Sequence, residues 1–257
     1  LAPARPHRKR AVAETHCEIY IQRVANSAAF DTKCYLPEDV QLQRAGVTEQ
    51  PRTWEQIRAA AEKLKAANAT AVPVTTSWPI WVLFEQMASI HNVLFASEEN
   101  GFAGLGAQMN LGDPLFRRVV DFVLGMQRDG LFRYGGRDNA GDPAFPTGEA
   151  AISFMSSALR ARVSTESRFR WASVPLPYFS GVTQEPKNGV LGGASLWTLT
   201  ARNRAAAEYK AVAEFYRFIS QPEQDMWWHE ATGYVPITVG GYERARAAGY
   251  YERNPGA

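Results

Sequence analysis

From residue 51 onward, helices whose ends are locally specified alternate with short apolar stretches of strand length, and this alternation constrains the fold more than any other feature. Thr53 and Gln56, three residues apart, have the pattern of a capping box. The sequence therefore predicts a helix from this point. Its apolar residues recur at spacings of three and four, on one face of the helix: Trp54, Ile57, Ala61 and Leu64.

A second helix is specified at both ends. Asp113 is its predicted N-cap, Pro114 occupies the first helical position, and the helix is expected to stop near Gly130. One face is apolar along its whole length: Leu115, Val119, Val123 and Met126. Residues 150–154 and 171–176, each bounded by turn or breaker residues, read as short buried strands.

Two further helices are predicted near the end of the chain. Residues 204–219 form the first, with four apolar side chains expected to point inward: Tyr209, Val212, Tyr216 and Ile219. The next is predicted to begin at Ser220, with Glu223 closing a capping box and Pro222 in the first turn, and to end at Gly233. Helices that alternate with strands in this way favour an α/β fold.

Composition limits the class of protein. The 257 residues are 46% hydrophobic, with 28 basic and 26 acidic residues, which suits a soluble globular protein with a sizeable core. No apolar run approaches the roughly 20 residues of a membrane helix. The basic residues near the start lack a following apolar stretch, so no secretory signal is expected in this chain. Cys17 and Cys34 allow one disulfide or two free thiols, and the sequence leaves both open.

Catalytic and nucleic-acid-binding classes receive little support. The four histidines, at positions 7, 16, 91 and 229, have no metal-ligand spacing, and neither a metal site nor a cofactor is predicted. The glycines at 101, 104 and 106 do not follow the dinucleotide-binding order. Carboxylates at Glu98 and Glu99, and at Asp138 and Asp142, leave a glycosidase as the enzyme alternative. The basic run at residues 5–10 is typical of a solvated tail rather than a nucleic-acid site.

Several ordered motifs resemble the periplasmic glycerol-3-phosphate-binding proteins of ABC importers, within the extracellular solute-binding family. The last third carries three of them: Gly192-Gly193-Ala194-Ser195-Leu196-Trp197, Thr232-Gly233-Tyr234-Val235-Pro236-Ile237-Thr238, and the residues 249–257 that end the chain. Upstream, Ser77-Trp78-Pro79-Ile80-Trp81 looks like the family's ligand segment. Tyr134-Gly135-Gly136-Arg137-Asp138 and Ser156-Ser157 continue in register.

The resemblance implies a set of ligand contacts: Ser156, Gly193 and Tyr234, with Trp78 and Trp81 in the ligand cleft and Ser27 as a hinge contact. Hydroxyl and backbone N–H groups suit phosphate or glycerol oxygens, and indoles cover the C–H faces of a polyol. Each residue also has a structural interpretation. The two tryptophans could be core or surface aromatics, Ser156 a helix cap, Gly193 a turn residue, and Tyr234 an ordinary half-buried tyrosine.

The family's fold is a maltose-binding-like, class II periplasmic-binding-protein architecture, with two α/β lobes joined by hinge strands. By comparison, most of the first lobe's sheet would precede residue 1 and a C-terminal part would follow residue 257, so the architecture is expected to be incompletely represented. Residues 1–50 are then an atypical stretch or hinge remnant and 51–178 the second lobe. Residues 179–232 form a crossover belonging to the first lobe, and 233–257 return to the second.

The implied function is a receptor and not an enzyme. It would capture sn-glycerol 3-phosphate or a glycerophosphodiester in the periplasm for an ABC permease, by hinge closure on the ligand. Aromatic platforms serve sugars equally well, so a sugar or oligosaccharide is the second interpretation. A third is a non-binding truncated remnant whose exposed apolar surface makes it associate, as the face with Tyr209 and Tyr216 could.

Overall fold

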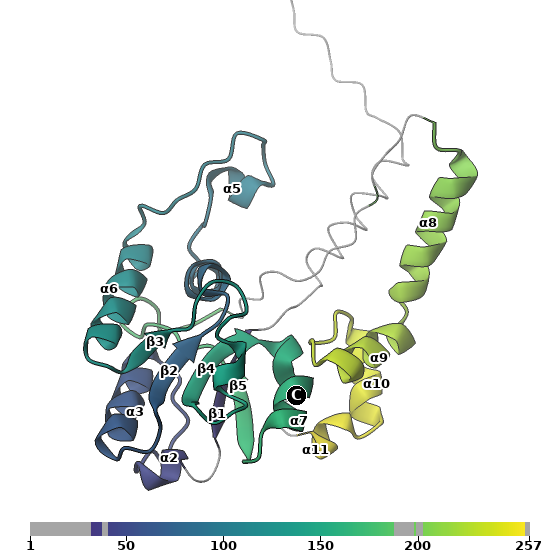
Figure 1. The fold of residues 1–257 in the computed structure, drawn as a ribbon. Coiled ribbons are helices and arrows are strands. Elements are labelled where there is room, and N and C mark those ends of the chain that lie inside the picture. The colour runs from purple at the N-terminus through teal and green to yellow at the C-terminus, as the bar shows by residue number, and fades with distance from the viewer. Residues whose placement is uncertain (1–31, 38–40, 188–197, 199–202, 255–257) are drawn as a thin grey trace, which may run out of the picture.

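The computed structural model describes residues 32–37, 41–187, 198 and 203–254. Within them, five strands form one mixed sheet in the order β3-β2-β4-β1-β5. The strand bounds are β1 Thr32–Pro37, β2 Val72–Thr76, β3 Phe132–Tyr134, β4 Ala150–Ser156 and β5 Trp171–Pro175. Predicted strands 150–154 and 171–176 correspond to β4 and β5, and the α/β class is confirmed (Figure 1).

Parallel pairing of β2 with β3 and with β4 brings the carboxyl ends of these three strands to one edge of the sheet. We call this the carboxyl edge, and define it by Ser77, Gly135 and Ser156, which follow or end the three strands. β1 runs antiparallel between β4 and β5, with Thr32 opposite Ser156. This strand lies within residues 1–50, the stretch called atypical above, and it was not predicted.

The helices are mostly short. Their bounds are α2 Gln41–Arg44, α3 Trp54–Ala66, α4 Gln86–Ile90, α5 Ser97–Gly101, α6 Pro114–Arg128, α7 Arg160–Glu166, α8 Ala206–Ile219, α9 Pro222–Thr232, α10 Val239–Ala247 and α11 Tyr250–Arg253. Three tighter or wider helical turns occur as well: the π-helix η1 Trp81–Glu85 and the 3₁₀ turns η2 Asp142–Ala144 and η3 Ser157–Leu159. No helix of the described residues is long and apolar enough to cross a membrane.

One face of the sheet is covered by α3, α6 and the η1–α4 segment, which enclose the main core. Trp54, fully buried at the start of α3, lies at its centre. Its ring is 5.0 Å from that of Phe154 on β4, 5.8 Å from Phe179 and 5.9 Å from Phe122 on α6, measured between centroids. Burying aromatic side chains of this size contributes most to a core. The apolar helix faces predicted from the sequence supply many side chains of this core.

The opposite face is covered by α7 and the segment around η2, where Phe145, Met155 and Val163 form a smaller core. Beyond α7 lie α9, α10 and α11 (Figure 1). The contact between α9 and α7 is close at Gly233, because a Cβ there would lie 2.9 Å from both the Arg160 Cβ and the Ser157 carbonyl oxygen. Gly233 also has a φ of 83°, which favours glycine.

The predicted helix ends are confirmed for α3 and α6. Thr53 and Gln56 form the capping box, and Asp113 accepts a hydrogen bond from the Leu115 N–H at 2.8 Å. The predicted start of α9 is wrong. Gln221 is its N-cap and Pro222 its first residue, because proline's fixed φ suits that position, while Glu223 pairs with Arg244 instead of closing a box on Ser220. Its predicted end at Gly233 is confirmed.

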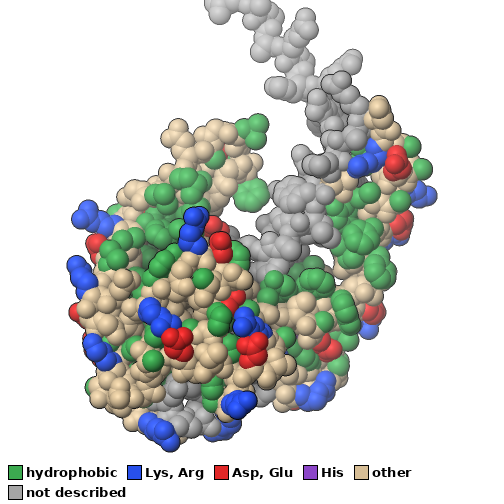
Figure 2. All heavy atoms as spheres, viewed as in Figure 1, with side chains coloured by type: hydrophobic (Ala, Val, Ile, Leu, Met, Phe, Trp, Pro, Cys, Tyr) green, Lys and Arg blue, Asp and Glu red, His purple; other side chains and the backbone are tan. Residues whose placement is uncertain are grey.

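Helix α8 carries no buried side chain. The four residues expected to point inward lie on its less exposed side and are only half-buried, which corrects that prediction: Tyr209, Val212, Tyr216 and Ile219. Phe215 and Phe218 of α8 are 53% and 51% exposed, and Trp227 and Trp228 of α9 are exposed as well. Figure 2 shows hydrophobic side chains at the surface over α8 and α9.

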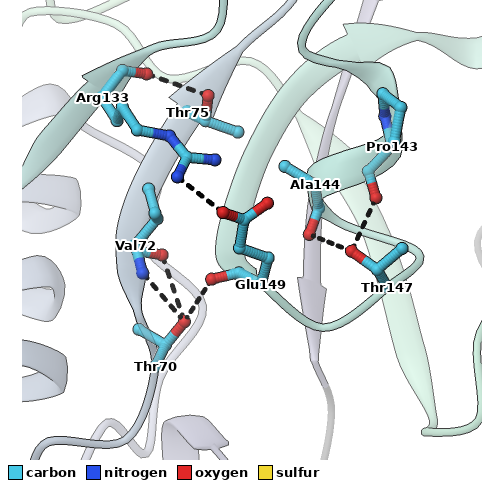
Figure 3. A network of polar contacts seen from close by, with 8 residues as sticks. All are labelled: Thr70, Val72, Thr75, Arg133, Pro143, Ala144, Thr147 and Glu149. Carbon is cyan, nitrogen blue, oxygen red and sulfur yellow. Dashed lines mark hydrogen bonds and ion pairs between the residues drawn. The ribbon is translucent and has the colours of Figure 1, made fainter.

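The β3–β4 connection is fixed by polar contacts (Figure 3). Arg133 on β3 binds Glu149 with a nitrogen to oxygen distance of 2.6 Å, and the Thr70 hydroxyl donates to the Glu149 carbonyl at 2.9 Å. The Thr147 hydroxyl donates to the Pro143 carbonyl, also at 2.9 Å. These contacts hold the end of the loop that leads from the carboxyl edge back to the start of β4, at the opposite edge of the sheet. Cys17 lies outside the described residues, so the question of a disulfide with Cys34 stays open.

Candidate functional site

The carboxyl edge is where a sheet of this kind offers a ligand site, since strand ends and the loops after them diverge there. Ser77 and Trp78 follow β2, Gly135 and Gly136 follow β3, and Ser156 ends the neighbouring strand β4. β2 lies between β3 and β4, so the Ser77–Trp78 turn is central. Motifs that are far apart in the sequence thus meet at one edge.

Trp78 adopts a left-handed backbone conformation with a φ of 49°, which is strained for a bulky residue. Its N–H donates to the Asp138 carbonyl at 2.6 Å, and its own carbonyl accepts from the Val82 N–H at 2.9 Å. The Ser77 N–H donates to the Phe154 carbonyl at 3.0 Å. These bonds hold the turn while the indole remains 39% exposed. A strained aromatic residue held at the carboxyl edge makes Trp78 a candidate functional residue.

The loop from Gly135 to Asp142 crosses directly over the end of β2. A Cβ on Gly135 would lie 2.8 Å from the Thr76 carbonyl oxygen, and one on Gly141 would collide with the same oxygen. Asp142 is buried; burial raises the pKa of its carboxyl, and the nearby Ser77 side chain lowers it by less. The glycines therefore allow a close approach that places Asp138 against Trp78.

The structure brings together Ser156 and Tyr234, two of the ligand contacts that the family resemblance implies. Burial raises the pKa of the Tyr234 phenol, and a hydrogen bond with the Ser156 side chain opposes that shift. The Ser156 hydroxyl also accepts from the Ala158 N–H at 3.3 Å and so caps η3, as its structural interpretation proposed. The hydroxyl of Ser156, at the end of β4, and the phenol of Tyr234, from a distant loop, thus lie together at the carboxyl edge.

The loop that carries Tyr234 is held by α9. The His229 Nδ1 bonds the Tyr234 carbonyl oxygen, and the Tyr234 N–H donates to the Thr232 hydroxyl at 3.2 Å. Nδ1 must carry the proton to donate to a carbonyl. Burial lowers the pKa of His229, with a smaller lowering from Arg160, so the ring stays neutral near pH 7. This histidine, one of the four without metal-ligand spacing, is therefore engaged in holding the loop.

Trp81 begins the π-helix η1 and is half-buried against the main core, which agrees with its structural interpretation. Its role in a ligand cleft stays a prediction. Gly193 and Ser27 lie outside the described residues. Among the described residues, no group of three or more histidine, cysteine, aspartate or glutamate side chains is placed to hold a metal ion.

Sequence reasoning missed Asp138, Gly141, Asp225 and His229 as supports of the site. The first was considered only as part of a carboxylate pair with Asp142. Asp225 and His229 are spaced four apart, so they share one face of a helix, and this was the available signal for that pair. For Asp138 and Gly141 no local pattern exists, because their partners lie about 60 residues earlier in the chain.

A second surface feature is an alternative place where a ligand could bind. A hollow between α3 and α6 is lined by Arg58, Arg117, Arg118, Asp113, Asp121 and Phe122, among others. Two of the arginines already have carboxylate partners: Arg58 pairs with Asp129 and Glu62, and Arg117 with Asp121 at 3.6 Å. The hollow is wide and open, and none of Trp78, Trp81, Ser156 and Tyr234 lines it.

The sequence of the chain identifies it as a bacterial extracellular solute-binding protein. The chain belongs to this family, whose sequence pattern matches residues 25–249. It is similar to the sn-glycerol-3-phosphate-binding periplasmic protein UgpB of Rhizobium meliloti, with 36% identity over 217 residues, 84% of this chain and 49% of that protein. The UgpB of Agrobacterium fabrum is 34% identical over 223 residues, 86% of this chain and 50% of that protein. The chain spans about half the length of these curated relatives.

Solved structures share the fold. UgpB from Mycobacterium tuberculosis, in complex with glycerophosphocholine, has a TM-score of 0.61 at 15% identity and covers 84% of this chain and 54% of that one. The GacH receptor of Streptomyces glaucescens has a TM-score of 0.66 at 17% identity, covering 88% and 58% of the two chains. Maltose-bound MalE3 of T. maritima has a TM-score of 0.62 at 15% identity, over 88% and 58%. The expected family and maltose-binding-like fold are confirmed.

Proposed function

We propose that this chain contributes the carboxyl-edge half of a site for sn-glycerol 3-phosphate or a glycerophosphodiester. The observation that carries the proposal is the Ser156–Tyr234 hydrogen bond, which joins two of the contacts implied by the family resemblance at the end of β4. Both hydroxyls can donate to phosphate or glycerol oxygens, and these bonds to the ligand would replace the bond between the two side chains. The adjacent Trp78 indole supplies an apolar face for the polyol carbons.

The whole protein would act as the periplasmic receptor of an ABC importer. Relatives that match 84% of this chain carry the name of sn-glycerol-3-phosphate-binding periplasmic proteins, which supports this assignment. Such a receptor closes its lobes on the ligand and presents the closed state to the permease subunits. Capture requires donors and shape but no chemical step, so we assign no catalytic residue.

The lobe assignment is also a proposal. We place residues 51–178 in the second lobe, 179–232 in a crossover belonging to the first, 233–257 back in the second, and treat 1–50 as a hinge remnant. Two observations refine this scheme. β1, which falls within residues 1–50, joins the same sheet as β4 and β5. α9, which falls within residues 179–232, packs against α7 of the second lobe. The half-buried face of α8 fits a segment that is not part of the second-lobe core.

A sugar or oligosaccharide is the second candidate. The exposed indole of Trp78 beside the hydroxyls of Ser156 and Tyr234 would suit a pyranose ring as well as a glycerol chain. Some structures that share the fold are named for acarbose or maltose, which keeps this candidate in view.

The first test is a thermal melt of the 257-residue chain with sn-glycerol 3-phosphate, glycerophosphocholine or maltose. A ligand that binds only the native state raises the midpoint, by an amount equivalent to about 2.7 kcal/mol at a hundredfold excess over Kd. We expect a rise with the two phosphates and none with maltose. A rise with maltose alone would favour the sugar candidate, and a cooperative melt that no compound shifts would favour the non-binding remnant.

A further inference from the structure

Asp225 is a buried carboxylate on α9 that accepts three hydrogen bonds from the loop after Tyr234. It is only 4% exposed. Its oxygens accept from the Ile237 N–H at 3.0 Å, the Thr238 N–H at 2.8 Å and the Thr238 hydroxyl at 2.7 Å. A buried carboxylate is costly unless it is hydrogen-bonded in this way. The chain therefore keeps a charge inside the protein at the point where the loop ends.

The same carboxylate lies at the beginning of α10. Thr238 is the N-cap of that helix and accepts from the Gly241 N–H at 2.9 Å. A negative charge is favourable near the N-terminus of a helix, where backbone N–H groups lack partners. Gly241 has no room for a side chain, because a Cβ there would collide with the Asp225 carboxylate. Asp225 thus fixes both the end of the loop and the start of α10.

The loop is fixed at its other end from the same helix. His229, one turn after Asp225, bonds the Tyr234 carbonyl oxygen, and Gly233 turns the chain against Arg160. Tyr234 therefore lies in a short segment, residues 233–238, that is held at both ends by one face of α9. Its phenol reaches Ser156 across the junction between the helical layer and the sheet.

We propose that Asp225 is a positioning residue for ligand binding, which acts by holding the phenol of Tyr234 at Ser156. This inference rests on the proposed function, because it assumes that the two hydroxyls contact the ligand. Asp225 itself lies behind the loop and does not contact the ligand.

A double-mutant cycle tests the coupling. Asp225→Asn keeps the shape but replaces one carboxylate oxygen with an amide N–H₂, which then faces the donor of Ile237 or those of Thr238. We expect it to weaken glycerophosphocholine binding about tenfold by calorimetry in the native background. In a Tyr234→Phe background the same change should have little effect, since the phenol it positions is gone. Equal losses in both backgrounds would overturn the inference. Asp121→Asn, on the exposed face of α6, is the matched control and should leave binding unchanged.

A second measurement does not depend on any ligand. The ultraviolet titration of tyrosine, taken as the difference between the native chain and Tyr234→Phe, isolates the Tyr234 phenol. Because burial holds its pKa above the ordinary value, Asp225→Asn should move that pKa downward as the loop loosens. An unchanged titration in a folded Asp225→Asn chain would overturn the inference. If the native chain binds no probe, the proposed function fails, while this titration still tests the role of Asp225.

Thr238→Val provides a second variant if Asp225→Asn does not fold. It removes the hydroxyl donor to the carboxylate, and with it the cap of α10, and keeps the two backbone bonds to Asp225. The same downward pKa shift is expected, smaller than for Asp225→Asn, with circular dichroism confirming that the chain is folded. A folded Thr238→Val chain with an unshifted Tyr234 titration would likewise contradict the proposal.

Discussion

At the residue scale, the turn after β2 shows how backbone geometry places a candidate ligand contact. Trp78 and Asp138 both have a φ of 49°, and the N–H of the first donates to the carbonyl of the second. Such conformations cost roughly 1–3 kcal/mol each and persist where the surroundings impose them. The surroundings here are the loop glycines, which bring the β3–β4 connection against the Thr76 carbonyl.

Gly141→Ala should therefore destabilise the chain by about 1–3 kcal/mol and weaken ligand binding, because the new Cβ collides with the Thr76 carbonyl oxygen and displaces the loop from Trp78. Urea unfolding and ligand calorimetry would measure the two effects. Gly112→Ala is the control, since a Cβ added at Gly112 would have nothing within 4 Å. Equal stability of the two variants would show that the loop does not hold the turn.

At the element scale, His91 joins two segments through both of its ring nitrogens. Nδ1 bonds the Met87 carbonyl in α4 at 2.7 Å, and Nε2 accepts from the Phe179 N–H after β5 at 2.9 Å. Accepting at Nε2 requires the neutral ring. Burial is the largest cause of a lowered pKa, Arg118 lowers it further, and the Met87 bond and Glu55 oppose the shift.

Stability should accordingly fall as the pH decreases through about 6.5, because the unfolded chain binds a proton that the folded His91 resists. One group contributes at most about 1.4 kcal/mol per pH unit. The lowered pKa of His229 likewise makes the chain less stable as the pH falls. Burial raises the pKa values of Asp142 and Glu85, so these two groups make the chain more stable as the pH falls. Comparison of urea midpoints from pH 7.5 to 5.5 for the native chain and His91→Gln isolates His91. The variant should be less stable at pH 7.5 but show a shallower dependence; an identical slope would contradict this account.

Elements with local signals could be predicted from the sequence, and those defined by distant partners could not. The caps at Thr53 and Asp113 specify α3 and α6 from within a few residues. β1 has no such signal, since its place depends on pairing with β4 more than a hundred residues later. Family resemblance supplied Ser156 and Tyr234, but their mutual hydrogen bond depends on α9 packing against α7.

At the scale of the whole molecule, the described surface divides into a well-covered sheet and an apolar outer side. The sheet is enclosed on one face by α3 and α6 and on the other by α7. Side chains on α8, α9 and α10 remain exposed, among them Phe215, Trp227 and Tyr242. Contiguous apolar surface of this kind favours association. Ligand measurements therefore belong at low protein concentration, where association of a non-binding remnant is least able to interfere.

The most direct test of the central claim is to map the ligand on the chain by amide chemical shifts. Glycerophosphocholine would be titrated into the ¹⁵N-labelled 257-residue protein. The account predicts perturbations at the carboxyl edge, in the Ser77–Trp78 turn, at Ser156 and Ser157, and in the Gly233–Tyr234 segment. Perturbations centred instead on the hollow between α3 and α6, around Arg58 and Arg118, or a ligand that binds without affecting Ser156 and Tyr234, would contradict it.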